Sequence, residues 1–328
     1  FNILIGSAMH DGFSRSACVT CGTSDPEFTC SRCRSAKFCG VGCFQQSWKT
    51  HRRSCHPIAP FAPSASTASL PPAPLGPSSL GPGVAVVVPF RNQLPLQDRL
   101  AQLTRFIPHM ESFLEGIRHA IIIVEQSQDG KKFNRGKLLN IGFKIAQEIL
   151  PDMQVFITHD VDLLPSCDLQ VAYARPPPEL CAVHLASVWG KYSYQNFLGG
   201  VLSFRPSDFE RINGYPNNYW GWGLEDDQLG LRMAHHGLRT LHVRTGGYED
   251  LDPINMKTIL ERQDKEEVRG HLPWYNLQMF QRGNLLLDQD WSRNGLNNLE
   301  FRQITASVQR TVHRRLVDLT EGSASEKP

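Results

Sequence analysis

The sequence has no hydrophobic run long enough to cross a membrane. Its longest apolar runs, VAVVV at 84–88 and AIIIV at 120–124, have the length of β-strands, whereas a membrane helix needs about 20 apolar residues. An excess of one charge is also lacking, because 34 Lys and Arg against 32 Asp and Glu leave a formal net charge of +2. The composition therefore gives no reason to expect nucleic acid or a charged membrane surface as a partner.

Cysteine is scarce outside one segment. Seven of the 9 cysteines lie between residues 18 and 55, and the two others, Cys167 and Cys181, are interpreted as small buried hydrophobic residues. The cysteine-rich segment has too few apolar residues to build a core, so it needs another source of stability. Its close cysteine pairs suit tight turns that bring two sulfurs to one metal. Its thiols and one imidazole supply ligands for two tetrahedral zinc sites: Cys18, Cys21, Cys30, Cys33, Cys39, Cys43, His51 and Cys55.

The main alternative for this segment is a disulfide framework. The number of cysteines in it is odd, and a disulfide framework leaves His51 without a role, so zinc is favoured. The spacing resembles the MYND-type zinc finger over 18–55. The resemblance implies two zinc ions, one on Cys18, Cys21, Cys39 and Cys43 and the other on Cys30, Cys33, His51 and Cys55. It also implies a proline-containing peptide as partner, with Phe38 and Trp48 lining the peptide groove or packing in the finger's own small core.

Composition divides the chain into five parts. An N-terminal segment (1–17) precedes the finger (18–55). A linker rich in Pro, Ala, Ser and Gly follows (56–83), and it lacks the apolar periodicity that would bury a core. From 84 to 310, strand-like and helix-like stretches alternate as in an α/β domain, and 311–328 is expected to be a C-terminal tail.

Four stretches in the 84–310 segment predict a sheet with a covering helix. Apolar runs at 84–92 and 119–126 indicate buried strands, and 154–165 indicates a third. Between the last two, residues 133–150 carry an apolar stripe at helical spacing: Leu138, Ile141, Ile145 and Ile149. The order strand, helix, strand favours a parallel, three-layer α/β sheet, in which ligands gather at the carboxyl ends of the strands.

The third predicted strand runs into two acids, Asp160 and Asp162, which therefore stand where a ligand is expected. Such carboxylates suit a hard divalent cation bound together with diphosphate oxygens. Asp is also common in turns that follow strands, so the motif is a weak signal by itself. It gains weight from arginines that can bind phosphate and aromatic rings that can line the flat face of a base: Arg91, Arg135, Phe90 and Phe133.

The stretch NNYWGWGLEDDQLG (217–230) places three acids directly after a loop of Trp and Gly. Adjacent carboxylates repel one another and raise each other's proton affinity, so Glu225, Asp226 and Asp227 need a cation, hydroxyl donors or open water. A simpler interpretation is that the acids begin a helix, because acids are favoured in a first turn and Leu229 and Met233 follow at helical spacing. That interpretation leaves the Trp-Gly-Trp-Gly run unexplained.

Several motifs in this segment resemble the β-1,4-galactosyltransferases of glycosyltransferase family 7. The motifs cover roughly 84–310 and occur in the family's order: VPFRNQLPLQDRL, FNRGKLLNIGF, HDVDLLP, FLGGVLSF, INGYPNNYWGWGLEDDQLGLRM and NGLNNLEF. FIPHM and HDVDLLP are most similar to the xylosylprotein branch, which extends the proteoglycan linker. The resemblance implies a GT-A fold, UDP-galactose as donor, manganese as cofactor and inversion at the anomeric carbon. It also implies a glycan or glycoprotein acceptor that ends in xylose or N-acetylglucosamine.

The same resemblance implies a role for each residue of the site. Asp226 would be the general base, Glu225 would hold hydroxyls of the donor sugar, and Asp227 would hold the acceptor sugar. Trp222 would cover the donor from a mobile loop, and Asp162 would ligate manganese. UDP-galactose would contact a further set of residues: Pro89, Phe90, Arg91, Phe133, Arg135, Asp160, Gly199 and Gly200.

Two positions depart from the family pattern. The family supplies further metal ligands after the acid helix as Met-x-x-His or His-x-His, whereas this chain has VRTGGYEDLDPINMKT (243–258), without histidine. The second departure is Phe197, where the family usually has a tyrosine. Candidate replacements for the missing metal ligands are Glu249, Asp250 and Asp252, with Met256 a poorer one, and the alternative is an acidic turn at the surface.

Two histidines near these motifs have structural interpretations. His184 is interpreted as a satisfied strand histidine, and His159 as a residue that orients the turn with Asp160 and Asp162.

More than one function stays open. The leading hypothesis is an active transferase with an extra zinc module. The altered metal segment and Phe197 favour an alternative, a protein that binds UDP-sugar or a protein partner without turnover, and a third is an erroneous gene model that joins two unrelated parts. A family-7 transferase is expected in the Golgi membrane or lumen, behind an anchor that would precede Phe1, whereas MYND fingers and zinc thiolates favour the cytoplasm as the alternative.

Overall fold

The computed structural model describes residues 81–92, 97–190, 197–221, 223–252, 276 and 291–319, and short N-terminal pieces at 3–5, 18, 20–22, 28–30 and 37–38. Most of the predicted linker lies outside these ranges, as do several predicted residues: Cys33, Cys39, Cys43, Trp48, His51, Cys55, Trp222 and Met256. The chain separates into two compact units, Phe1–Pro77 and Ser78–Pro328. Among the helices in the described ranges, none is both long and apolar enough to cross a membrane.

The described strands of the first unit form a three-stranded antiparallel sheet. Its order is β1 (Ile3–Ile5), β2 (Phe28–Cys30) and β3 (Lys37–Phe38). Thr20 and Cys21 lie in a tight turn, after which the Gly22 N–H donates to the Cys18 carbonyl oxygen over 2.9 Å. The φ of Gly22 is 75°, a conformation that glycine adopts without strain. A turn of this kind is what the spacing of Cys18 and Cys21 predicts.

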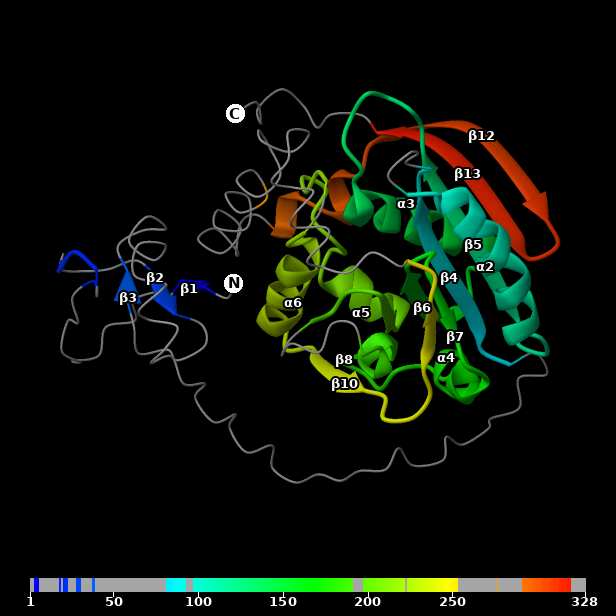
Figure 1. Cartoon of the computed structure of the whole chain (residues 1–328), viewed down its shortest axis with the longest axis horizontal. Coiled ribbons are helices and arrows are strands. Elements are labelled where there is room, and N and C mark those ends of the chain that lie inside the picture. Colours follow the sequence, from blue (N-terminus) through cyan, green and yellow to red (C-terminus); the bar gives the residue numbers. More distant parts are fainter. Residues whose placement is uncertain are drawn as a thin grey trace. The chain divides into compact units, whose positions relative to one another are not determined.

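An eight-stranded mixed sheet forms the centre of the second unit (Figure 1). The strands β6, β4, β5 and β13 are parallel, and so are β10 and β8, whereas β9 and β12 run antiparallel to their neighbours. A parallel arrangement is therefore confirmed for the three strands that were predicted and wrong for the sheet as a whole. From edge to edge the order is β10 (Arg239–His242), β8 (Cys181–His184), β9 (Val201–Phe204), β6 (Met153–His159), β4 (Gly83–Phe90), β5 (His119–Gln126), β13 (Val312–Leu319) and β12 (Phe301–Gln309).

The predicted strands and helix agree with the structure in position. The stretches 84–92 and 119–126 form β4 and β5, and 133–150 contains α3 (Arg135–Ile149). The third predicted strand is divided, because β6 ends at His159 and β7 (Leu163–Pro165) begins after a turn. β7 pairs with β11 (Tyr248–Asp250) in a separate two-stranded sheet.

Alternate residues of β4 face two different cores. Val84, Val86 and Val88 pack into the core that includes residues of α2, whereas Ala85 and Val87 pack into the core that includes residues of α3. This alternation follows from the pleat of a strand, in which successive side chains point to opposite faces. A continuous apolar run therefore produces a sheet that is covered on both faces.

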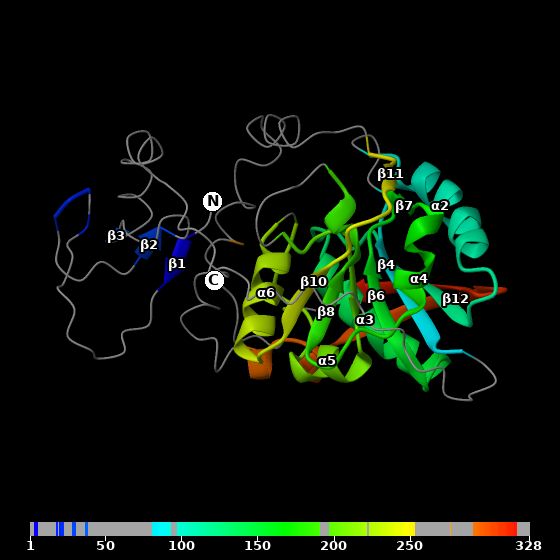
Figure 2. The ribbon, with the colours of Figure 1, turned by 90° about the horizontal axis from the view of Figure 1, so that it is seen from below.

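Helices cover both faces of this sheet (Figure 2). One face carries α3, α5 (Pro206–Arg211) and α6 (Glu225–His235), and the other carries α2 (Arg99–Phe113) and α4 (Gln170–Ala174). Three short 3-10 helices complete the described elements: η1 (Cys167–Leu169), η2 (Leu185–Val188) and η3 (Leu296–Asn298). Cys181 is buried, as predicted, whereas Cys167 is exposed at the start of η1, so the prediction for Cys167 is wrong.

Two helices begin at side-chain caps. The Asn134 side-chain oxygen accepts from the Lys137 N–H over 2.9 Å, and the Asp98 carboxylate accepts from the Ala101 N–H over 3.0 Å. A cap of this kind stabilises a helix by about 1 kcal/mol. The two caps fix the places of Arg135 and Arg99, the first residues of α3 and α2.

The C-terminal boundary of the domain differs from the prediction. We expected the domain to end at residue 310, whereas β13 (Val312–Leu319) lies in the interior of the sheet, between β5 and β12. Residue 310 instead lies in the turn of the β12–β13 hairpin, where Arg310 has a φ of 55°. The local sign of β12 is the alternation of Ile304, Ala306 and Val308 with polar residues, although this strand is exposed at nearly every position.

Candidate active site

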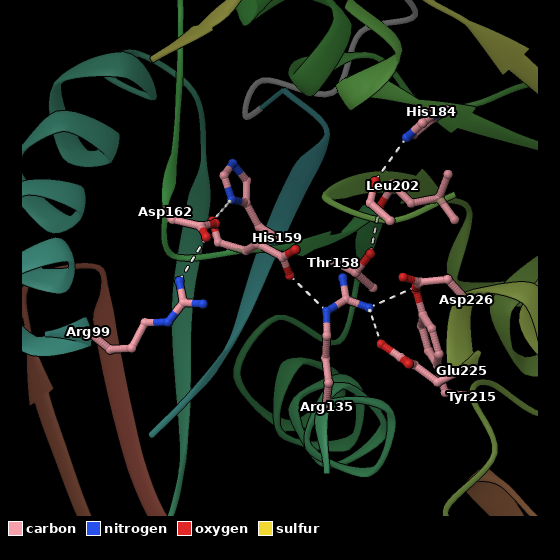
Figure 3. A network of polar contacts seen from close by, with 12 residues as sticks. Arg99, Arg135, Thr158, His159, Asp162, His184, Leu202, Tyr215, Glu225 and Asp226 are labelled. Carbon is pink, nitrogen blue, oxygen red and sulfur yellow. Dashed lines mark hydrogen bonds and ion pairs between the residues drawn. The ribbon is translucent and has the colours of Figure 1, made fainter. Parts of the chain in front are cut away.

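The turn after β6 places Asp160 beside Arg135 and Asp162 beside Arg99, and Figure 3 labels Asp162 and both arginines. The Asp160 N–H donates to the Gly200 carbonyl oxygen over 3.1 Å, which holds this turn against the start of β9. Asp160 Oδ1 accepts a hydrogen bond from Arg135 Nε over 2.8 Å. Asp162 Oδ2 accepts one from Arg99 Nη1, also over 2.8 Å. The two carboxylates of the predicted metal motif are therefore paired with different arginines, one from α3 and one from α2.

The three adjacent acids form the first turn of α6, as the simpler interpretation predicts. Leu229 and Met233 of this helix are buried in the core. The residue before the helix, Leu224, has a φ of 72°, in a left-handed region that costs an L-residue roughly 1–2 kcal/mol. This strained turn leads the chain from the Trp-Gly loop directly into the acids of the site.

Arg135 connects the two acid groups of the site (Figure 3). Its Nη1 atom lies 2.8 Å from Oδ1 of Asp226 and 3.6 Å from Oε1 of Glu225, while its Nε atom binds Asp160. The Arg135 side chain is 12% exposed, so water screens these ion pairs little. One guanidinium thus holds together the turn after β6 and the start of α6, which are far apart in the sequence.

Burial changes the protonation of the acids. Desolvation raises the pKa of Glu225 to about 8, and repulsion by Asp226 adds to the rise. Desolvation also raises the pKa of Asp160 to about 6, against the opposing effect of Arg135. The pKa of Asp227 is raised to about 6 by burial and by Asp226. The sequence suggests mutual repulsion as the cause of raised pKa values. In the structure, repulsion among the acids raises these pKa values less than the loss of water around them does.

Two residues outside the acid cluster shape the surroundings of Asp226. The Tyr215 hydroxyl donates to Asp226 Oδ1 over 3.4 Å, and the Tyr215 ring centre lies 5.8 Å from Arg135 Cζ. At Gly199, an added Cβ would lie 2.9 Å from Asp226 Oδ2 and 2.6 Å from the ring of Phe197. The glycine predicted to form the floor of the donor site therefore lies directly against the predicted base. The sequence does not identify Tyr215 as a site residue. The one indication of such a role is that Tyr215 belongs to the INGYPNNYWGWG motif.

His184 supports this glycine from β8. Its Nε2 atom donates to the Gly199 carbonyl oxygen over 2.9 Å, and its ring is buried. The interpretation of His184 as a satisfied strand histidine is confirmed. Because His184 binds the carbonyl oxygen of Gly199, it is also a neighbour of the site.

The residues predicted to contact the nucleotide gather at the carboxyl end of β4 and before α3. Arg91 Nη1 donates to the Lys131 carbonyl oxygen over 2.7 Å, and Arg91 Cζ lies 5.6 Å from the centre of the Phe133 ring. Phe133 is half-buried, whereas Phe90 is 1% exposed in the core, and Pro89 is buried beside it. Phe133 is therefore better placed than Phe90 to stack on a base.

Hydrogen bonds hold the glycines on either side of position 222. The Gly221 N–H donates to the Phe133 carbonyl oxygen over 2.7 Å, and the Gly223 carbonyl oxygen accepts from Asn276 Nδ2 over 3.0 Å. The φ angles of Gly221 and Gly223 are 81° and 99°, which only glycine adopts without strain. The start of the Trp-Gly loop is thereby tied to the segment that carries Phe133.

The candidate metal ligands have different surroundings. Glu249 forms an ion pair of 2.6 Å with Arg105 at the surface, with both side chains 58% exposed. Asp252 is buried, and Asp250 lies in β11 opposite Leu163. The Leu251 N–H donates to the Asp162 carbonyl oxygen over 2.7 Å, which places this segment beside Asp162.

One oxygen atom in this region suits a cation. Asp162 Oδ1 is buried and has no hydrogen-bond partner in the described part of the chain, and Asp250 and Asp252 add further carboxylates in the neighbouring segment. Oxygen donors of this kind are those that hard divalent cations prefer. Within the described ranges, no three His, Cys, Asp or Glu side chains are already grouped closely enough to hold a metal ion. Asp162, Asp250 and Asp252 supply the kind of oxygen donors that manganese prefers, whereas the Glu249 carboxylate is paired with Arg105.

A buried chain of side chains lies behind the turn after β6. His159 Nδ1 lies 2.8 Å from the Asp160 carbonyl oxygen, which can only accept, so this nitrogen carries the hydrogen. Burial lowers the pKa of His159 to about 4, so the ring is neutral and its Nε2 accepts from the Tyr173 hydroxyl over 2.9 Å. The Tyr173 oxygen in turn accepts from the Tyr248 hydroxyl over 2.9 Å. The contact with Asp160 agrees with the interpretation that His159 orients this turn.

A network of asparagines holds the segment before the Trp-Gly loop. Asn217 Nδ2 donates to the Gly295 carbonyl oxygen over 2.7 Å and to Asn298 Oδ1 over 2.9 Å. Asn217 Oδ1 accepts from Asn140 Nδ2 over 2.9 Å, and the Asn217 carbonyl oxygen accepts from Asn134 Nδ2 over 2.7 Å. Sequence reasoning missed this network, although the abundance of Asn in INGYPNNYWG and NGLNNLEF is its signal.

Family models match both units. The model described as the N-terminal region of glycosyl transferase group 7 matches residues 79–174, and the one described as the N-terminal domain of galactosyltransferase matches residues 181–256. The MYND finger model matches residues 18–55. These matches cover the predicted finger and most of the predicted transferase domain.

Curated relatives carry galactosyltransferase names. Beta-1,4-galactosyltransferase 7 of Drosophila melanogaster is 33% identical over 72% of this chain and 66% of its own length. Xylosylprotein 4-beta-galactosyltransferase of Caenorhabditis elegans is 38% identical over 49% of this chain and 53% of its own length. Beta-1,4-galactosyltransferase 4 of Rattus norvegicus is 31% identical over 68% of this chain and 59% of its own length. The chain thus spans between about half and two thirds of the length of these relatives.

A solved structure supports the fold. The catalytic domain of Drosophila β-1,4-galactosyltransferase 7 in complex with xylobiose matches with a TM-score of 0.58 and 28% identity, over 73% of this chain and 94% of that chain. A mutant of that enzyme in complex with manganese, UDP-Gal and xylobiose matches equally well. The expected GT-A fold is confirmed, and the chain belongs to glycosyltransferase family 7, with a MYND finger before the transferase domain.

Proposed function

We propose that this chain transfers galactose from UDP-galactose to a sugar hydroxyl with inversion, forming a β-1,4 linkage. The observation that carries the proposal is the placement of Asp226. This carboxylate stands at the start of α6 against Gly199, and it is oriented by Arg135 and Tyr215. A xylose-terminated acceptor is favoured over N-acetylglucosamine, because the related Drosophila enzyme forms a complex with xylobiose.

Asp226 would act as the general base. Arg135 and Tyr215 both bind its Oδ1 atom, so Oδ2 is the oxygen that would accept the proton of the acceptor hydroxyl. The deprotonated hydroxyl oxygen attacks the anomeric carbon as the bond to UDP breaks on the opposite side. Fixing Oδ1 orients the carboxylate before the acceptor arrives, which lowers the entropic part of the barrier.

The neighbouring acids would bind sugars. The raised pKa of Glu225 favours its protonated form, in which the side chain can donate as well as accept hydrogen bonds with hydroxyls of the donor. Asp227, on the next position of the same helical turn, would hold the acceptor sugar. Trp222 would cover the donor, with Gly221 and Gly223 as the flexible positions of its loop.

The donor nucleotide would lie between the end of β4 and the start of α3. Phe133 would stack on the base, Arg91 would bind phosphate oxygens, and Gly199 and Gly200 would line the floor. Manganese would be held by Asp162 with Asp250 and Asp252. When bound, this metal supplies a Lewis acid that stabilises the negative charge of the departing diphosphate.

The first test is transfer from UDP-galactose by the full chain with manganese, using xyloside and N-acetylglucosaminide acceptors. We expect Asp226→Asn to lower kcat by about 10²–10⁴-fold while donor binding is kept. Asp168→Asn, an exposed carboxylate on η1, is the matched control and should keep full activity. Donor binding without transfer by the unmodified chain would instead support a protein that binds UDP-sugar without turnover, which Phe197 and the altered metal segment favour.

The finger would add a protein-interaction module. We propose that its seven cysteines and His51 hold two zinc ions and that it binds a proline-containing peptide. A measured zinc content of two per chain, reduced to one by Cys18→Ala, would support the paired sites. The Golgi membrane or lumen is the proposed location of the transferase, and the cytoplasm is the alternative that the finger favours.

A further inference from the structure

The two oxygen atoms of the Asp162 carboxylate have unlike partners. Oδ2 accepts from Arg99 Nη1 over 2.8 Å, whereas Oδ1 is buried and has no hydrogen-bond partner among the residues that the structure describes. Asp162 is 9% exposed as a whole residue. An unpaired buried carboxylate oxygen costs free energy, so this atom is suited to bind a cation.

The start of α2 connects Arg99 to the segment after β11. Arg99 Nε donates to Gln97 Oε1 over 3.1 Å, and Gln97 Nε2 donates to Asp252 Oδ2 over 2.9 Å. Gln102 takes part from the next turn, where its Oε1 accepts from Arg99 Nη1 over 2.9 Å and its Nε2 donates to the Leu251 carbonyl oxygen over 3.3 Å. Arg99 therefore has two neutral amide acceptors besides Asp162.

These contacts make Arg99 a replaceable partner of Asp162. A divalent cation that binds the Asp162 carboxylate would lie within a few ångströms of the guanidinium, where two positive charges repel each other strongly in a partly buried site. The Arg99 side chain is 21% exposed, so it has access to water when it moves. It can also keep its bonds to Gln97 and Gln102 while it gives up Asp162.

We propose that Arg99 and a divalent cation compete for the Asp162 carboxylate, so that Arg99 sets the affinity of the site for its metal. The inference rests on the proposed function for the choice of manganese. Arg99 then stabilises Asp162 when the metal concentration is low, and metal binding releases the first turn of α2 from the turn after β6. The site would bind its metal more weakly than the same carboxylates would bind it without Arg99.

The test is manganese binding by the full chain, with its finger loaded with zinc, followed by the electron paramagnetic resonance signal of free Mn²⁺. No sugar nucleotide is present, so the result does not depend on turnover. We expect Arg99→Gln to tighten binding by at least about tenfold, because a positive charge in contact with the ligand is removed. Arg105→Gln is the matched control, since Arg105 lies on the same helix and pairs with a carboxylate at the surface. It should change the affinity by less than twofold.

Asp162→Asn identifies the binding site and should abolish the tight binding in either background. Unchanged or weaker binding by Arg99→Gln would overturn the competition while leaving the proposed transferase intact, and absence of binding in every variant would overturn both the competition and the proposed metal. Galactose transfer is measured separately, so loss of transfer with the expected binding shifts would count against the proposed function alone.

A measurement on the unmodified chain covers the case in which Arg99→Gln does not fold. In protein labelled with ¹⁵N-arginine, the guanidinium protons of Arg99 should exchange with water faster at saturating Mg²⁺, because their carboxylate partner is lost. The protons of Arg105 should not change. Unchanged or slower exchange at Arg99 would contradict the proposal.

Discussion

Arg135 Nη1 lies 2.8 Å from Asp226 Oδ1, and both side chains are largely buried. The same guanidinium binds Asp160, so a single cation from the first residue of α3 joins acids that follow β6 and acids that begin α6. The Asn134 cap fixes where this cation stands. The helix cap thus positions a guanidinium that pairs with one acid 25 residues away and with another 91 residues away.

Arg135→Gln should destabilise the chain strongly. The substitution leaves Asp160, Glu225 and Asp226 close together without their shared cation, and breaking a buried pair of this kind costs about 3–5 kcal/mol. Urea unfolding at pH 7 measures the change in the free energy of unfolding. Arg105→Gln, in an exposed pair with Glu249, should change it by less than about 1 kcal/mol. Equal effects of the two substitutions would contradict the central role of Arg135.

Glu225→Gln should change how stability depends on pH. The carboxyl has a pKa near its ordinary value of 4.5 in the unfolded chain and about 8 in the folded chain. Between these pH values the folded state holds a proton that the unfolded state has lost, so the free energy of unfolding falls as the pH rises. A glutamine is neutral at every pH and removes this contribution. Relative to the unmodified chain, the variant should therefore gain at least about 1 kcal/mol more in free energy of unfolding at pH 8 than at pH 5.

The measurement for Glu225 is urea unfolding at a series of pH values from 5 to 8. Glu148→Gln, an exposed acid on α3, is the control and should leave the pH dependence unchanged. A Glu225→Gln variant that follows the pH dependence of the unmodified chain would show that Glu225 is ionised in the folded protein.

Gly199→Ala should reduce transfer without unfolding the chain. The new methyl group would meet the Phe197 ring at 2.6 Å and Asp226 Oδ2 at 2.9 Å, so one of these side chains must move. We expect kcat to fall by at least about tenfold, because a displaced base loses its alignment with the acceptor. Gly190→Ala is the control, since an added Cβ there meets no atom of the described residues within 4 Å. Adding Phe197→Leu to Gly199→Ala should recover part of the activity if crowding by the ring is the cause.

Asn217→Ala should loosen the segment that leads into the Trp-Gly loop. The substitution leaves Asn140, Gly295 and Asn298 without their buried partner, and each unsatisfied group costs roughly 1–3 kcal/mol. Thermal unfolding measures the loss of stability, and the KM for the donor reports the loop. Gln147→Ala, which removes an exposed hydrogen bond to Glu210, should have little effect on either quantity.

The parts of this fold that the sequence predicts well are those with a local signature. Runs of Val and Ile predict β4 and β5, and a helical stripe with an Asn cap predicts α3. The acids of α6 are found because three of them are adjacent. Each of these patterns is complete within about 20 residues, so no knowledge of the tertiary structure is needed.

The parts that the sequence does not predict depend on contacts between distant segments. Nothing local to Arg99 and Asp162 indicates that they meet, and Tyr215 looks like one aromatic residue of a motif until its hydroxyl is placed near Asp226. Likewise, Glu249 and Asp252 are equal candidates as metal ligands in the sequence, and their burial separates them. Burial and pairing of this kind are properties of the assembled sheet.

The placement of β13 has a consequence for biosynthesis. β13 pairs with β5, and beside this pairing the Ser127 hydroxyl donates to the carboxylate of Asp318, which is 191 residues away. A growing chain on the ribosome therefore presents β5 with one unpaired edge until nearly the whole transferase domain has been made, and loop closure over such a distance is slow. During that interval the exposed backbone of β5 is open to wrong partners, so the nascent protein is expected to depend on chaperones until its last hairpin emerges.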